Sequence, residues 1–248
     1  MSEALERLVE KAGNPYRLGR HIELDPRSLG YRLQQSPSIK PAEHLSPIPI
    51  LDQGNLGSCV GNAATRHLAA IYGPDMSGIL LHGRTLTLDP DTDERFAVEL
   101  YHAATVKDGF PGVYPPNDTG SSGLGAMRAL KEAHLISAYH WATSLRGFAS
   151  MLQRGSCIIG MPWYEAFFNP DTHGFIDADT HWAGSGLAGG HEVYVAALEA
   201  WDDRDSRKVV FRLDNSWGTS WGAHGSFRMH GSTYIMLRHQ IDLKQATR

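Results

Sequence analysis

The sequence predicts an α+β protein built from two lobes. Amphipathic, helix-like segments fill the first part of the chain, and strand-like segments rich in β-branched and aromatic residues follow after about residue 155. Helices and strands that are segregated along a chain pack as separate layers, and functional sites often form in the cleft between two lobes. A chain of 248 residues is long enough to bury a sizeable core.

We expect three regions along the chain. Residues 1–50 would form a short helix over residues 2–12 and then a proline-rich extended arm that packs on the body. Residues 51–150 would form a mainly helical lobe, and residues 151–248 a mainly β lobe. If the arm crosses the cleft, it would act as a regulator, and its deletion should raise activity.

The individual elements follow from apolar spacing and from turn residues. The first helix of the body is expected to begin at Cys59 and to end at Gly73-Pro74, and a small hairpin is expected in "ILLHGRTLTLD". Further helices are expected in "DERFAVELYHAAT", "GLGAMRALKEAHL" and "SLRGFASMLQRG". Strands are expected in "CIIGMPW", "EVYVAALEAW", "KVVFRLDNSW" and "GSFRM".

The acidic run "DPDTDE" has the alternating aspartates of a calcium-binding EF-hand loop. That loop needs glycine at its sixth position and glutamate at its twelfth, where this chain has Glu94 and Leu100. We therefore interpret the run as a turn that caps the following helix.

Composition excludes several classes of function. A net charge of −4 gives no general case for nucleic-acid or membrane-surface binding, and no apolar run approaches the length of a membrane span. The N-terminus lacks the pattern of a secretory signal, so we expect a cytoplasmic or virion-associated protein. Its two cysteines, Cys59 and Cys157, are expected to be free, and no metal or other cofactor is expected.

Cys59 is the candidate nucleophile. A thiol nucleophile needs a stabilised thiolate, a base, and donors for the oxyanion that forms on attack. At the start of a helix, the Cys59 thiolate would face unpaired backbone N–H groups and the positive end of the helix dipole. Gln53, six residues upstream, could supply a second oxyanion donor beside the backbone N–H of Cys59.

The candidate base lies in the β half of the chain. His191 follows two glycines at the start of a strand-like run, in "AGGHEVYVAAL". Asn215 in "DNSWGTSWG" could accept a hydrogen bond from the ring N–H of His191 and so fix its tautomer, while Trp217 could cover that bond.

These blocks together resemble the papain family of cysteine peptidases. The resemblance rests on Gln53, "GSC" at 57–59, "GGH" at 189–191 and "NSWGTSWG" at 215–222, which occur in the family's order. It implies a papain-like two-lobed fold, with a helical N-terminal lobe, an antiparallel β-barrel-like C-terminal lobe and the active-site cleft between them.

The resemblance also implies roles for individual residues. Cys59 would be the nucleophile, His191 its imidazolium partner and later the acid for the leaving amine, Asn215 the residue that orients His191, and Gln53 a member of the oxyanion hole. Trp217 would shield the His–Asn contact, with Trp221 packed beside it. The Gly-rich segment with Gly120 and Gly123, together with Gly190, would line the substrate-binding wall. The substrate would be a peptide or protein.

The chain also departs from the family pattern. Val60 follows the nucleophile where the best-known members have tryptophan, and the disulfides of secreted members cannot form, which makes the sequence more similar to signal-less bacterial or phage relatives. Cys157 is expected to be a small core residue. Glu192 would place a carboxylate near the S′ side or face solvent. An alternative hypothesis is that the chain is a binding or structural component of a larger assembly, such as a phage particle, on a papain-like scaffold.

Overall fold

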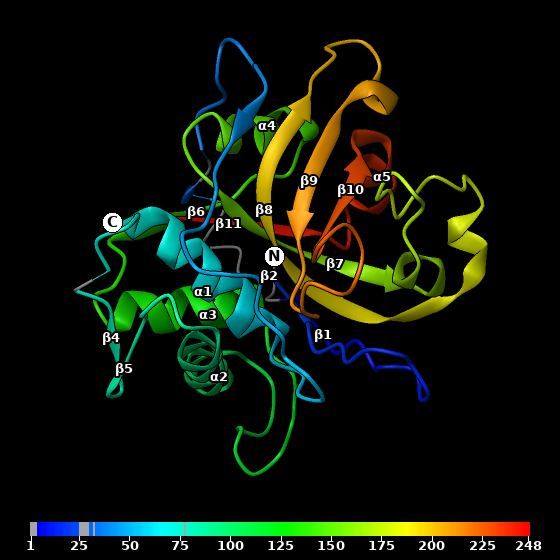
Figure 1. Cartoon of the computed structure of the whole chain (residues 1–248). Coiled ribbons are helices and arrows are strands. Elements are labelled where there is room, and N and C mark those ends of the chain that lie inside the picture. Colours follow the sequence, from blue (N-terminus) through cyan, green and yellow to red (C-terminus); the bar gives the residue numbers. More distant parts are fainter. Residues whose placement is uncertain (1–3, 25–29, 32, 77) are drawn as a thin grey trace.

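The computed structural model describes residues 4–24, 30–31, 33–76 and 78–248, which form two lobes (Figure 1). Three helices make up one lobe, and an antiparallel sheet with two further helices makes up the other. The helices of the first lobe are α1 (Cys59–Tyr72), α2 (Pro90–Lys107) and α3 (Gly123–Glu132).

Helices α1 and α3 begin where the sequence indicates, whereas α2 begins at Pro90, three residues before the expected start at Asp93. Asp89 precedes α2 and accepts a hydrogen bond from the backbone N–H of Thr92, so the acidic run caps a helix as expected. Ser122 caps α3 in the same way, through the N–H of Gly125. The hairpin expected between α1 and α2 is formed by β4 (Leu80–Leu81) and β5 (Arg84–Thr85).

The second lobe is built on a sheet whose strand order is β10-β9-β8-β7-β11-β6, with β3 also paired to β8. Every pairing in this sheet is antiparallel. The order is linear, so the sheet does not close into a barrel. Its strands are β3 (Ala42–Glu43), β6 (Ala138–His140), β7 (Cys157–Tyr164), β8 (Leu187–Ala200), β9 (Val210–Asp214), β10 (Ser226–His230) and β11 (Asp242–Thr247).

Two helices cover part of the sheet. They are α4 (Leu145–Leu152) and α5 (Gly231–Leu237). Phe148 of α4 stacks on Phe211 of β9 at 4.0 Å between ring centroids, and Tyr234 of α5 packs beside it at 5.3 Å. Buried apolar residues form one core within this lobe and a second among α1, α2 and α3, and Cys59 belongs to the second.

The helix expected over residues 2–12 is not formed in residues 4–12. This part of the chain is extended, and β1 (Ala4–Glu6) pairs with β2 (Ile22–Leu24). The helical prediction requires Leu5 and Val9 to share a buried face, but both are exposed. Backbone hydrogen bonds to the body replace those of a helix, including Lys11 N–H to the carbonyl of Ala188. The dark-blue segment that passes below β7 in Figure 1 is this part of the chain.

The elements that we did not predict include the helix α5 and the strand β11. β11 lies between β7 and β6, and its residues Asp242, Lys244 and Gln245 are buried although they are polar. Polar residues in a central strand mask the apolar pattern by which strands are recognised. Among the described residues, no helix is both long and apolar enough to cross a membrane.

Candidate active site

Cys59 is the first residue of α1, as the sequence predicts, and its side chain is 0% exposed. Ser58 precedes the helix, but its side chain does not cap it. The first N–H groups of a helix have no partner within the helix, so they face the position of the thiol. Helix α1 packs against β8, the strand that carries His191, and the backbone of Glu192 lies close enough to the thiol to act on its pKa.

His191 lies in β8 and is joined to the loop after β9. Its Nε2 lies 2.7 Å from Oδ1 of Asn215, and Oδ1 also accepts a hydrogen bond from the backbone N–H of Ser216. Because Oδ1 can only accept, Nε2 carries the proton and Nδ1 is left free in the neutral ring. Nδ1 is buried and has no hydrogen-bond partner among the described residues. The imidazole and the Cys59 thiol are therefore not hydrogen-bonded to each other in this conformation.

Tryptophan side chains enclose the His191–Asn215 pair. The Trp217 ring stacks on the His191 ring with 4.6 Å between centroids and 24° between planes. Trp221 packs edge-on against Trp217 at 5.0 Å, and Trp163, which we did not predict, contacts the edge of His191 at 4.9 Å. The rings exclude water from the bond to Asn215, which strengthens a hydrogen bond.

Gln53 is also buried in this site. Its Oε1 accepts a hydrogen bond from the Ser216 hydroxyl at 2.6 Å, which fixes the amide orientation. Its Nε2 donates to the carbonyl of Leu56 at 2.7 Å and to the carbonyl of Arg17 at 3.3 Å. The indole N–H of Trp217 donates to the same Arg17 carbonyl at 3.2 Å. A carbonyl of the N-terminal arm thus contacts the amide nitrogen that we expect to stabilise an oxyanion.

The three glycines expected to bind substrate have different surroundings. Gly190 lies under the arm, where an added Cβ would be 2.3 Å from the carbonyl oxygen of Arg20. Gly120 has a φ of +69° and also lies under the arm, with Gly19 as its neighbour. Gly123 instead is the first residue of α3. It leaves room for the Glu192 carboxylate, since a Cβ added at Gly123 would lie 2.8 Å from Oε1 of Glu192.

The arm runs through the gap between the two lobes. The N–H groups of Gly19 and Arg20 donate to the carbonyl of Gly190, and Gly19 and His21 exchange backbone hydrogen bonds with Ser121. Gly19 is packed so closely that a Cβ on it would lie 2.1 Å from the carbonyl oxygen of Gly57. These contacts on both lobes are those of a peptide bound in a cleft.

Burial of the site shifts the pKa values of both Cys59 and His191. Burial raises the pKa of Cys59 to about 12, although hydrogen bonds from the backbone of Glu192 and Val60 oppose this shift. Burial lowers the pKa of His191 to about 4, against the hydrogen bond to Asn215. A thiolate–imidazolium pair was expected here, but in this conformation both groups are neutral near pH 7, because the arm and the aromatic rings exclude water.

Glu192 neither lines the S′ side nor faces solvent, which corrects our expectation. It is 0% exposed and lies in a cluster with Arg20, Asp242 and Lys244, all nearly completely buried. Arg20 donates to Oδ1 of Asp242 at 2.5 Å, and Lys244 donates to its other oxygen at 3.1 Å. We call these four residues the buried charge cluster. Gly160 makes room for it, since a Cβ there would lie within 2.6 Å of three of the side chains.

Sequence reasoning missed this cluster because its members are far apart in the chain and carry no motif. Arg20 comes from the arm, Glu192 from β8, and the other two from β11. The only local signal is the alternation in "IDLKQAT", which fits a strand but does not indicate that its polar side chains are buried. Cys157, by contrast, is a free, fully buried residue of β7, as expected.

The fold is that of papain-like cysteine proteases. The chain is similar to xylellain, a cysteine protease from Xylella fastidiosa, with 17% identity, a TM-score of 0.70 and coverage of 96% of this chain and 98% of that chain. It is similar to digestive procathepsin L 3 of Tenebrio molitor larval midgut, with 15% identity, a TM-score of 0.57 and coverage of 88% and 74%. Similarity to proCathepsin B S9 from Trypanosoma congolense reaches 12% identity, a TM-score of 0.56 and coverage of 98% and 87%.

At the level of sequence, no family model matches the chain, and none of the curated proteins is significantly similar to it. The likeness is therefore one of fold. This chain is 12–17% identical to these structures and shares their architecture over most of its length.

Proposed function

We propose that this protein is a cysteine-type peptidase that hydrolyses peptide or amide bonds through a thioester intermediate. Cys59 is the nucleophile, His191 the acid and base, Asn215 the positioning residue for His191, and Gln53 an oxyanion donor. Val60 and the two free cysteines support a place among bacterial or phage-type relatives, and free thiols fit a reducing compartment such as a cytoplasm.

The observation that carries this proposal is the tautomer of His191. Asn215 holds the Nε2 proton, and the rings of Trp217 and Trp163 pack on the imidazole. The free nitrogen, Nδ1, is a buried acceptor with no hydrogen-bond partner in the part of the chain that the structure describes. An unpaired buried nitrogen costs stability, so its retention next to a helix that starts with cysteine supports a chemical use.

The reaction then follows in two steps. The Cys59 thiolate attacks the carbonyl carbon, the backbone N–H of Cys59 and the Gln53 amide stabilise the oxyanion, and the C–N bond breaks as Nδ1 of His191 delivers its proton to the leaving amine. Water then gives a proton to Nδ1 and attacks the thioester, which releases the acid and regenerates the thiolate. The hydrogen bond to Asn215 keeps the His191 ring in the orientation that both proton transfers at Nδ1 require.

The covered conformation implies that the arm must move before substrate enters. Arg17 places its carbonyl on the Gln53 and Trp217 donors, and Gly19 fills the space beside Gly57 and Gly190. The arm therefore competes with substrate for the same groups. Activity is reduced by the fraction of molecules in which the arm is in place.

Hydrolysis of fluorescein-labelled casein tests the proposal. Gly19→Ala and Leu18→Asp each disturb the arm at a buried contact, and we expect hydrolysis at least about tenfold faster than with the parent protein. Gly30→Ala is the matched control, because a methyl group there would meet no atom within 4 Å. Circular dichroism checks that each variant is folded.

The nucleophile is tested in the Gly19→Ala background. Cys59→Ala should abolish casein hydrolysis, and Cys157→Ala should retain it, since Cys157 lies in the core of the other lobe. Iodoacetamide should label Cys59 well ahead of Cys157 once the arm is displaced. Casein hydrolysis that survives Cys59→Ala would show that the peptidase assignment is wrong.

A further inference from the structure

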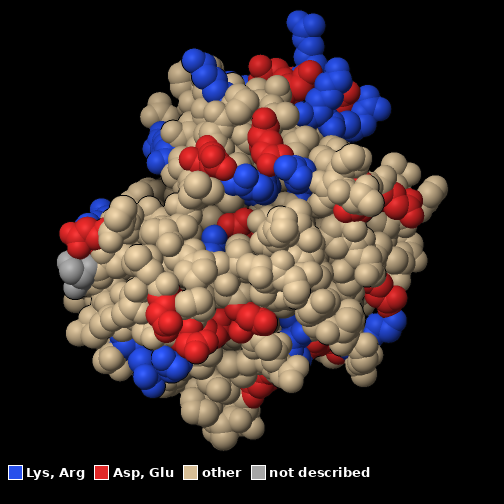
Figure 2. Space-filling model, viewed as in Figure 1, with Lys and Arg blue, Asp and Glu red and all other residues tan. Residues whose placement is uncertain are grey.

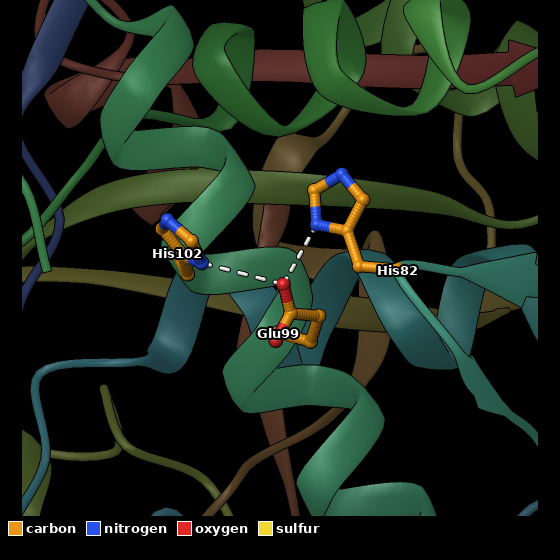
Figure 3. Close-up of side chains that lie close together, drawn as sticks. All are labelled: His82, Glu99 and His102. Atoms are coloured by element: carbon orange, nitrogen blue, oxygen red, sulfur yellow. Dashed lines mark hydrogen bonds and ion pairs between the residues drawn. The ribbon is translucent and has the colours of Figure 1, made fainter. Parts of the chain in front are cut away.

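A cluster of two histidines and one glutamate lies on the helical lobe, outside the candidate active site. His82 comes from the turn between β4 and β5, while Glu99 and His102 come from α2. Their nearest ligand atoms all lie within 4.8 Å of one another. Figure 3 shows that a ring nitrogen of each histidine points at the same carboxylate oxygen.

The backbone at His82 is unusual in a way that serves this arrangement. His82 has a φ of +47° and Gly83 a φ of +83°, the left-handed conformations of a two-residue hairpin turn. Asparagine is the residue most often favoured at the first of these positions, and a bulkier side chain there is strained. Here the strained position presents an imidazole to α2, where Glu99 and His102 share a face at i, i+3 spacing.

From this geometry we propose that His82, Glu99 and His102 bind a divalent transition-metal ion, with Zn²⁺ as its representative. Nδ1 of His82 and Nδ1 of His102 lie 2.7 and 3.3 Å from Oε1 of Glu99. Two ligands of one tetrahedral zinc ion are about 3.3 Å apart, given metal–ligand bonds of about 2.0–2.1 Å. Small side-chain rotations therefore suffice to seat the ion.

The chemistry of the ligands selects the class of ion. Two imidazoles with one carboxylate suit zinc and its transition-metal neighbours, whereas calcium and magnesium prefer ligand sets made of oxygen atoms. The side chains of His82, Glu99 and His102 are 58%, 22% and 35% exposed, so an ion reaches the site from solvent and water completes its coordination. The neighbouring cation, Lys107, is paired with Glu132 at 2.6 Å.

The bound ion would join the β4–β5 hairpin to α2. His82 lies in the turn of the hairpin, whereas the other two ligands lie in α2. The three ligands therefore come together only while the hairpin is packed against α2. An ion that binds the folded but not the unfolded chain stabilises the protein by mass action. This site is independent of the proposed peptidase activity, and it goes against our expectation from the sequence that no metal is bound.

Titration of the full chain with Co²⁺ and Zn²⁺ tests the proposal. The Cys59→Ala variant is used as the parent so that the thiol cannot bind the ion. We expect visible d–d absorption of four-coordinate Co²⁺, displaced by Zn²⁺, one Zn²⁺ per chain by calorimetry, and a rise in melting temperature of about 2–4 °C or more with Zn²⁺ in excess.

The informative variant is His82→Asn, because asparagine keeps the turn conformation while removing the imidazole. We expect it, Glu99→Gln and His102→Ala each to weaken Zn²⁺ binding at least about tenfold. His224→Asn is the matched control, since His224 is also exposed with a φ of +57° but lies in another loop. Absence of the Co²⁺ absorption, or equal Zn²⁺ affinity in His82→Asn and its parent, would overturn the proposal.

Discussion

Replacing Arg20 with methionine should destabilise the protein strongly, because it removes one charge from the buried charge cluster. Arg20 is 0% exposed and lies in the arm, and its guanidinium is paired with Asp242. The cluster contains two cations and two anions, so the ionised set is neutral. Without Arg20, Lys244 alone would face Asp242 and Glu192, so the interior carries a net charge of −1 whenever Glu192 is ionised.

The magnitude follows from the burial of these groups. Removing one partner of a buried ion pair costs about 3–5 kcal/mol, because the remaining charge is left uncompensated. For a chain of this size, that loss lowers the melting temperature by about 6–20 °C. Burial together with the Asp242 carboxylate already raises the pKa of Glu192 well above its usual range. Protonation of Glu192 therefore limits the loss at low pH.

The sign of the pH dependence follows from this shift. A carboxyl whose pKa is raised on folding binds its proton more tightly in the folded state, so stability falls as pH rises above the unfolded value. Arg20 opposes the rise in the pKa of Glu192. The deficit of Arg20→Met, relative to the parent protein, should accordingly be larger at pH 8 than at pH 5.5.

Urea unfolding followed by circular dichroism measures the loss, with Arg17→Met as the control. Arg17 lies three residues away in the same arm and is also paired with acids, Glu10 and Asp118, but its side chain is 35% exposed. Such a pair contributes below about 1 kcal/mol. In Arg20→Met, adding Glu192→Gln restores neutrality and should recover about 1–3 kcal/mol.

Two outcomes would refute this reasoning. If Arg20→Met and Arg17→Met lowered the free energy of unfolding equally, burial of the charge would not be the cause. If Glu192→Gln made Arg20→Met less stable, the cluster would not be governed by its net charge.

Two further predictions concern the histidines. Asn215→Ala in the Gly19→Ala background should lower kcat for casein about 10- to 100-fold with KM nearly unchanged, because the hydrogen bond that orients His191 is lost. An unchanged kcat would show that Asn215 does not have this role. Burial lowers the pKa of His191 to about 4 and that of His67 to about 3, so the unfolded chain binds more protons below pH 6.5. The free energy of unfolding should therefore fall as pH decreases from about 6.5 to 4. His67→Gln should make this fall smaller when it is measured by urea unfolding. If the dependence on pH were unchanged in His67→Gln, His67 would not contribute to it.

The sequence by itself determined the main architecture and the order of the site. The start of α1 at Cys59, the end of that helix at Gly73, and the change from helices to strands are local properties, set by apolar periodicity and capping residues. The resemblance of the blocks around Gln53, His191 and Asn215 to the papain family predicts that His191 and Asn215 meet, and Nε2 of His191 lies 2.7 Å from Oδ1 of Asn215. The fold class was confirmed by the same papain-like architecture in xylellain and the procathepsins.

Only the tertiary structure decided the state of the site and the path of the arm. The spacing of Leu5, Leu8 and Val9 predicts a helix, but hydrogen bonds to β8 and burial of Leu18 hold this segment extended in the cleft. The pKa of Cys59 depends on that cover, and the ion pair of Arg20 joins residues 222 positions apart. Desolvation and charge pairing depend on neighbours in space, and no local pattern in the sequence encodes them.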